Sequence, residues 1–92
     1  MNTTITAEKL EHYFRITGEA LTMAKAHIND ERRRAAEECL DMAQRYYHDA
    51  SHFKSKDDWV DAFAALSYAH GWLDCGARNG FFDVTDNRLF TV

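Results

Sequence analysis

Mostly apolar residues recur at alternating steps of three and four along three long stretches of the chain. The first stretch contains Leu10, Phe14, Thr17, Leu21, Ala24 and Ile28. The second contains Ala36, Cys39, Ala43, Tyr46, Ala50 and Phe53, and the third contains Trp59, Phe63, Leu66, His70, Leu73 and Ala77. This spacing places each set on one face of an α-helix, whereas a strand would alternate every second residue. The pattern therefore predicts helices at about residues 6–28, 31–55 and 58–79.

The segments between the predicted helices carry residues that cap helices. Asn29 and Asp30 are good N-cap types for the second helix, and Asp57 or Asp58 can cap the third. Gly80 suits the position just after the third helix ends. The chain of 92 residues contains no proline, and its short linkers require neighbouring helices to run antiparallel. We therefore expect one all-α domain over residues 1–92, an up-down-up antiparallel three-helix bundle.

The third predicted helix carries a second row of small and apolar residues beside the first. This row consists of Ala62, Ala65, Ala69, Trp72 and Gly76. Two adjacent rows make a broad face that contacts two neighbours, so this helix is expected at the centre of the packing. The tail that follows, residues 80–92, is too apolar to remain free in water. We expect it to fold back over its own bundle; the alternative is that it packs on another subunit.

Composition and charge exclude several classes of protein. An apolar fraction of 46% with a net charge of −4 is not typical of a disordered chain. No apolar run approaches the roughly 20 residues that span a bilayer, so no membrane association is expected. The start of the chain lacks the order of a signal peptide, and two cysteines are too few for a disulfide scaffold. These features predict a cytoplasmic protein.

The only basic run does not indicate a nucleic-acid partner. Acidic residues surround Arg32, Arg33 and Arg34, and the spacing predicts the ion pairs Arg33–Glu37 and Arg34–Glu38. A solvated helix face of this kind, in a chain with net negative charge, is a poor phosphate-binding surface. No nucleic acid is expected as a partner.

Two histidines have the spacing of a metal-binding pair. His48 and His52 stand four residues apart, with Asp49 after the first, which resembles the helical motif of zinc hydrolases. Both point away from the predicted core, and the sequence names no third ligand, so a solvated surface pair is the favoured interpretation. Cys39 is expected as a buried apolar residue, and Cys75 nearer the polar edge. We expect no cofactor and no bound metal.

The most plausible ligand site is a polar row on the third helix. His70, Asp74 and Arg78 are spaced by four residues and would form a line along one face. The simpler interpretation is a core histidine with a satisfied ring beside a surface ion pair. Gly71 lies next to this row in mid-helix, where alanine would be better by roughly 1 kcal/mol. Its presence suggests that the tail, a partner helix or a ligand approaches the backbone there, and the tail is the simplest choice.

Longer segments of the chain resemble a known family. They are EKLEHYFRITGEAL, YYHDASHF, DDWVDAFAALSYAHGWLDCGARNGFFDV and the closing LFTV. Together they resemble the archaeal domain of unknown function family 357, and the most specific part is YAHGWLDCGARNG, residues 68–80. The resemblance covers nearly the whole chain and implies a small α-helical bundle from an archaeon. It implies no activity, substrate or catalytic residue.

Two classes of function remain open at this stage. The second apolar row and the apolar tail, without an assembled catalytic motif, favour a non-catalytic protein–protein interaction module, with a protein partner or with itself as a homo-oligomer. The alternative is a small enzyme or ligand-binding protein that uses His70, Asp74 and Arg78, or a metal held by His48 and His52. Three-helix bundles of this size rarely enclose a pocket, which favours the module.

Overall fold

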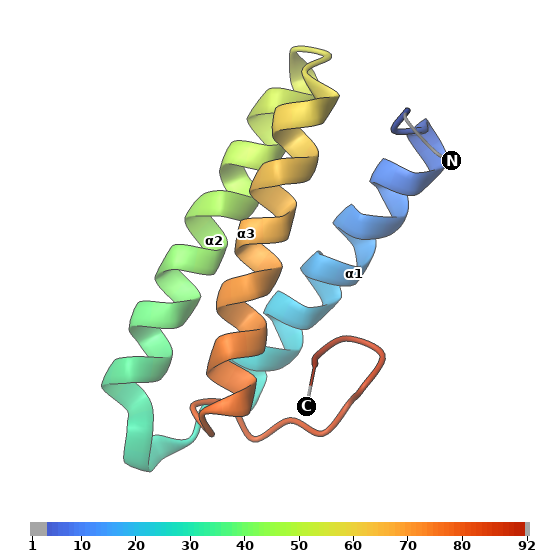
Figure 1. Ribbon diagram of the computed structural model, residues 1–92. Coiled ribbons are helices and arrows are strands. Elements are labelled where there is room, and N and C mark those ends of the chain that lie inside the picture. Colours follow the sequence, from blue (N-terminus) through green and yellow to red (C-terminus); the bar gives the residue numbers. More distant parts are fainter. Residues whose placement is uncertain (1–3, 92) are drawn as a thin grey trace.

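The computed structural model describes residues 4–91, which form a bundle of three α-helices. These are α1 (Ala7–Ala26), α2 (Arg33–Ser55) and α3 (Trp59–Arg78), with a single 3₁₀ turn, η1 (Asp30–Arg32), between the first two. Helices α2 and α3 lie side by side as a long antiparallel hairpin, and α1 crosses this hairpin at an angle (Figure 1). The predicted all-α antiparallel bundle is confirmed. Residues 1–3 and Val92, at the two ends of the predicted domain, lie outside the described residues.

The predicted capping residues mark the helix ends, with one difference. The Asp58 side chain accepts a hydrogen bond from the Asp61 N–H at 3.2 Å, and Gly80 adopts a φ of +73° just past α3. Asn29 accepts from the Glu31 N–H at 3.1 Å, but it thereby caps η1 instead of α2. Helix α2 therefore begins at Arg33, two residues later than the sequence predicts, because the 3₁₀ turn takes up the first residues.

Alanine residues bring α2 and α3 together. Ala43 and Ala50 of α2 and Ala62 and Ala69 of α3 are all fully buried. A methyl side chain lets two helix backbones approach closely, and α2 and α3 share the most extensive contact in the bundle. The second row of α3 is buried more completely than the first, in which Trp59 is only half-buried. The expectation that α3 has a broad packing face is therefore confirmed.

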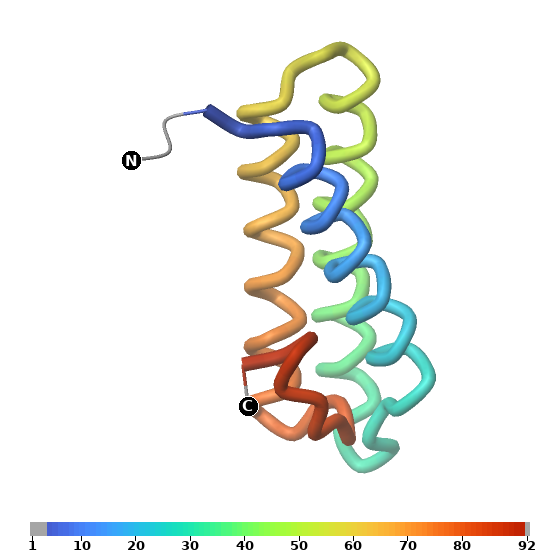
Figure 2. The backbone as a smooth tube through the Cα atoms, turned by 90° about the vertical axis from the view of Figure 1, so that its right-hand side faces the viewer, coloured from blue at the N-terminus to red at the C-terminus, as the bar shows by residue number. Residues whose placement is uncertain are grey.

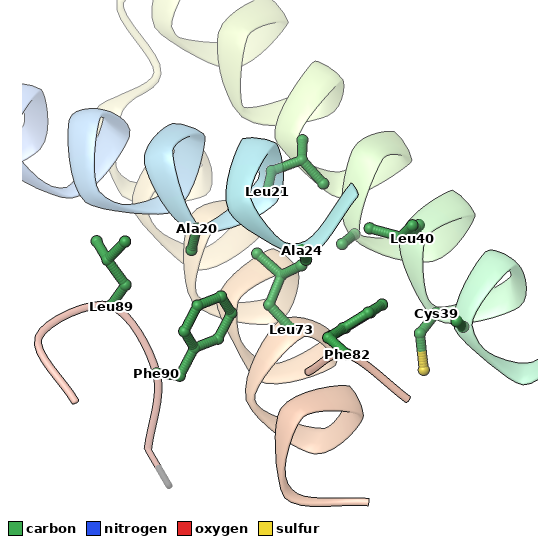
Figure 3. Packing of buried hydrophobic residues seen from close by; sticks show 11 residues of the cluster. Ala20, Leu21, Ala24, Cys39, Leu40, Leu73, Phe82, Leu89 and Phe90 are labelled. Carbon is green, nitrogen blue, oxygen red and sulfur yellow. The ribbon is translucent and has the colours of Figure 1, made fainter. Parts of the chain in front are cut away.

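The C-terminal segment, residues 80–91, folds back over its own helices, as expected. Phe82, Leu89 and Phe90 are each at most 2% exposed and belong to the same core cluster as Leu73 of α3. Figure 3 shows these aromatic and aliphatic side chains gathered beneath α1. The start of the segment is tied to the end of α1, where the Asp83 N–H donates to the His27 carbonyl at 2.7 Å. Burying three large apolar side chains stabilises the fold by about 1.5–3 kcal/mol for each one.

Gly76 makes room for the aromatic ring of Phe82. A Cβ placed on Gly76 would overlap this ring, whose Cζ atom lies 2.9 Å from that position. A buried ring cannot move aside cheaply, so only glycine fits here. The small residue at the end of the second row of α3 thus contacts a side chain from the C-terminal segment.

Among the helices described here, none is long and apolar enough to cross a membrane.

Two glycine substitutions on α3 should have opposite effects on stability. We expect Gly76→Ala to lower the free energy of unfolding by about 1–3 kcal/mol, because the added methyl group displaces Phe82. Gly71→Ala is the matched control: no atom lies within 4 Å of its Cβ position, so better helix propensity should stabilise the protein by about 0.5–1 kcal/mol. Chemical denaturation measures both values. A Gly76→Ala variant as stable as the natural protein would contradict the packing described here.

Candidate functional site

His70 joins three parts of the structure through its ring nitrogens. Its Nε2 atom lies 2.6 Å from the Leu89 carbonyl oxygen in the C-terminal segment, and its Nδ1 atom lies 3.1 Å from Thr17 Oγ1 on α1. A carbonyl oxygen only accepts hydrogen bonds, so Nε2 carries a proton and donates it; in the neutral ring Nδ1 accepts from the Thr17 hydroxyl. This contact explains why Thr17, a polar residue only 1% exposed, occupies the apolar row of α1. The interpretation of His70 as a core histidine with a satisfied ring agrees with this geometry.

Asp74 holds the end of the C-terminal segment. Its Oδ1 atom accepts from the Thr91 N–H at 2.8 Å, and its Oδ2 atom accepts from the Thr91 hydroxyl at 3.2 Å. The same carboxylate lies 3.8 Å from His70 Nε2. Two neighbouring residues of one helix face, His70 and Asp74, therefore bind the backbone of the segment at Leu89 and Thr91. We call this pair the tail latch.

Arg78 does not join the row that the sequence predicts. Within residues 4–91 it makes no ion pair with Asp74, whose two carboxylate oxygens are both engaged by Thr91. Arg78 is exposed in the last turn of α3. The predicted row therefore ends at Asp74, and its carboxylate binds Thr91 from the far end of the chain.

An ion pair between Arg88 and Glu19 anchors the C-terminal segment to α1. Arg88 Nη2 lies 2.7 Å from Glu19 Oε2, and this hydrogen bond and charge raise the pKa of the Arg88 guanidinium above its ordinary value. The two residues are 69 positions apart, so no local pattern could have found the pair. Both side chains are largely exposed, which limits the contribution of the pair to stability.

An open pocket of about 430 Å³ lies beside the tail latch. It is lined by Tyr13 of α1, Phe63 and Gly71 of α3, and Phe90 of the C-terminal segment, together with the latch residues themselves. The expectation that the tail covers Gly71 is wrong, because no atom lies within 4 Å of its Cβ position. The segment crosses α3 at His70 and Asp74, and Gly71 is left exposed.

The polar atoms of His70 and Asp74 are already hydrogen-bonded within the chain. Among the described residues, every buried side-chain nitrogen or oxygen has a hydrogen-bond partner. Both ring nitrogens of His70 and both carboxylate oxygens of Asp74 are bonded within the chain. A ligand that bonded to the His70 ring would have to displace the Leu89 carbonyl or the Thr17 hydroxyl.

The other candidate residues lie apart from this site. His48 and His52 are both exposed on α2, and no group of three or more His, Cys, Asp or Glu side chains within residues 4–91 could hold a metal ion. Cys39 is buried as expected, and this burial raises the pKa of its thiol above the ordinary value; the charges of Cys75 and Glu38 add to the shift. Cys75 is exposed on α3.

Removing the carboxylate of the latch should release the end of the chain. We expect Asp74→Ala to lower the free energy of unfolding by about 1.5–3 kcal/mol, because the Thr91 N–H and hydroxyl lose their hydrogen bonds to a charged carboxylate. Hydrogen exchange at the Thr91 amide should become faster. Asp49→Ala, which removes an exposed aspartate from α2, serves as the control and should change stability by less than about 0.5 kcal/mol. Unchanged exchange at Thr91 would show that Asp74 does not hold the segment.

The two thiols should differ in reactivity. In the native protein at pH 8 we expect a thiol-specific reagent to label Cys75 quickly and Cys39 only slowly, because Cys39 is buried and its raised pKa leaves little thiolate. Denaturant should expose both thiols. The Cys75→Ser variant isolates the slow reaction of Cys39. Labelling of both cysteines at similar native rates would contradict the burial of Cys39.

Comparison with known proteins gives a family without a function. No curated protein and no solved structure matches the chain. A family model described as a protein of unknown function (DUF357) matches residues 12–82, which include α2, α3 and most of α1. The matched region also contains His70 and Asp74 but ends before Leu89 and Thr91, their partners in the C-terminal segment. This chain belongs to the DUF357 family of proteins of unknown function.

Proposed function

We propose that this protein is a non-catalytic interaction module that presents the outer face of α3 to a protein partner. We define this face by its exposed residues, which are Val60, Asp61, Ala64, Ser67, Tyr68, Gly71, Cys75, Arg78 and Asn79. At about 3.6 residues per turn they fall within one third of the helix circumference, opposite the buried alanine row.

The lack of charge on the middle of this face, between Asp61 and Arg78, is the observation that carries the proposal. From Ala62 to Leu73 the sequence contains no Asp, Glu, Lys or Arg, although 28% of the whole chain is charged. The solvent-facing sides of α1 and α2 carry many charged residues, as water-exposed helices usually do. An uncharged surface on one helix of a charged protein is typical of an interaction site.

Large apolar side chains on the outer face strengthen the argument. Val60 is 71% exposed and Tyr68 is 64% exposed. The Tyr68 ring stacks on the ring of Tyr46 from α2, with centroids 5.3 Å apart. Stacking holds the two rings in place before a partner binds, and tyrosine is enriched at protein interfaces because a rigid ring loses little entropy there.

The alternative function, a ligand or catalytic site at His70 and Asp74, has less support. These residues are bonded to Thr17 of α1 and to Leu89 and Thr91 of the C-terminal segment. A role in holding the fold together accounts for all of these contacts. The outer face of α3, by contrast, makes few contacts inside the chain, of which the stacking of Tyr68 on Tyr46 is one.

Site-specific crosslinking tests the proposal. A photoreactive phenylalanine analogue in place of Tyr68 should crosslink to a discrete protein in cells that produce this chain, because it would lie inside the interface. The same analogue in place of His48, an exposed residue of α2, is the matched control and should give no discrete product. Equal crosslinking from both positions, or none from Tyr68, would exclude the outer face of α3 as the interaction surface.

A further inference from the structure

We infer that the partner of the outer face of α3 is a second copy of this chain, packed antiparallel across a two-fold axis. This inference rests on the proposed function and names the partner for the same surface. The distribution of size and charge along the face points to this partner, and no residue of the tail latch takes part.

The residues of the outer face are placed symmetrically about the middle of the helix. The midpoint lies between Ala69 and His70. Tyr68 and Gly71 are equally far from this midpoint, and so are the pairs Ala64 with Cys75, Asp61 with Arg78, and Val60 with Asn79. An antiparallel second copy with its two-fold axis at the midpoint therefore brings the two members of each pair opposite each other.

Charge complementarity favours this orientation. The outer face carries only two charged residues, Asp61 in the first turn of α3 and Arg78 in the last. In the antiparallel arrangement Asp61 of one copy meets Arg78 of the other, twice per dimer. In a parallel arrangement each residue would meet its own copy and repel it. The uncharged residues between them, Ala62 to Leu73, impose no repulsion in the middle of the contact.

Shape favours the same arrangement at the centre of the face. Tyr68 is a large exposed side chain, and Gly71 has no atom within 4 Å of its Cβ position. Near the two-fold axis, Tyr68 of each copy would lie over the bare backbone at Gly71 of the other. The Tyr68 ring of the second copy would account for a glycine in mid-helix, Gly71, that the chain itself leaves uncovered. Packing a large residue against a small one is how two helices interdigitate.

The contact extends from α3 onto α2. A helix of 20 residues is about 30 Å long, and one helix pair alone buries less than the roughly 800 Å² per partner of a standard interface. Beside Cys75 a second groove of about 550 Å³ is lined by Trp72 of α3 and by Met42, Glu38 and Asp41 of α2. Tyr46 of α2 stacks on Tyr68. A second copy that covers these residues as well enlarges the interface beyond the single helix pair.

Charge reversal on the full-length protein tests this geometry. Sedimentation equilibrium from about 1 µM to 1 mM should show a reversible monomer–dimer equilibrium. Asp61→Arg and Arg78→Asp should each weaken the dimer by about tenfold or more, because two attractions become two repulsions. The double variant, which carries both changes, should recover the dissociation constant of the natural protein to within about threefold. Circular dichroism melts verify that each variant is folded.

A second pair of variants tests the centre of the face. Tyr68→Glu should make the protein monomeric throughout the concentration range, because it places two like charges near the axis. His48→Glu introduces the same charge at an exposed position of α2 and should leave the dimer unchanged. Equal weakening by both variants would overturn the inference.

The remaining outcomes separate this inference from the proposed function. A natural protein that stays monomeric at 1 mM, or a double variant that remains as weak as the single variants, overturns the antiparallel dimer. If Tyr68 then crosslinks to a different protein, the interaction module stands with another partner. If Tyr68 crosslinks to nothing, the proposed function falls as well.

Discussion

The close contact between α2 and α3 determines the rest of this structure. Fully buried alanines on both helices, such as Ala50 and Ala62, allow their backbones to approach. Helix α1 contacts the hairpin less extensively and crosses it at an angle, as Figure 2 shows from the side. The C-terminal segment lies against α3 near the end of α1 and completes the core there with Phe82, Leu89 and Phe90. The Phe82 ring lies at the Cβ position of Gly76, so this part of the core also depends on a small residue of α3.

Two polar residues of α3, His70 and Asp74, hold the C-terminal segment against the core. Hydrogen bonds from His70 and Asp74 fix the backbone at Leu89 and Thr91, so the apolar side chains of the segment are held in one register over the core. Because those atoms are bonded inside the chain, the side of α3 that faces α1 is a structural surface. The opposite side is largely exposed, yet it has fewer charges than the solvent-facing sides of α1 and α2.

Local features of the fold could be predicted, and features that depend on distant residues could not. The i, i+4 ion pairs Arg33–Glu37 and Arg34–Glu38 form at 3.5 and 3.7 Å, because helix geometry alone brings them together. Arg78 followed the same rule in the sequence, but Thr91 engages the carboxylate that it would have paired with. Gly71 looked like a point of close approach, since a glycine in mid-helix has no local explanation. The path of residues 80–91 decides both cases, and apolar content alone does not specify such a path.

The sequence by itself determined three helices with their apolar faces, and the residues Asp58 and Gly80 at the ends of the third, because these depend on periodicity and on neighbours within one turn. It also determined that the C-terminal segment must be buried, since its apolar side chains cannot remain in water. Only the tertiary structure decided that His70 bonds to Thr17 and Leu89, that Phe82 lies on Gly76, and that the outer face of α3 stays uncovered. These contacts join residues up to 53 positions apart, and their geometry is fixed by how the helices pack together and not by any local preference.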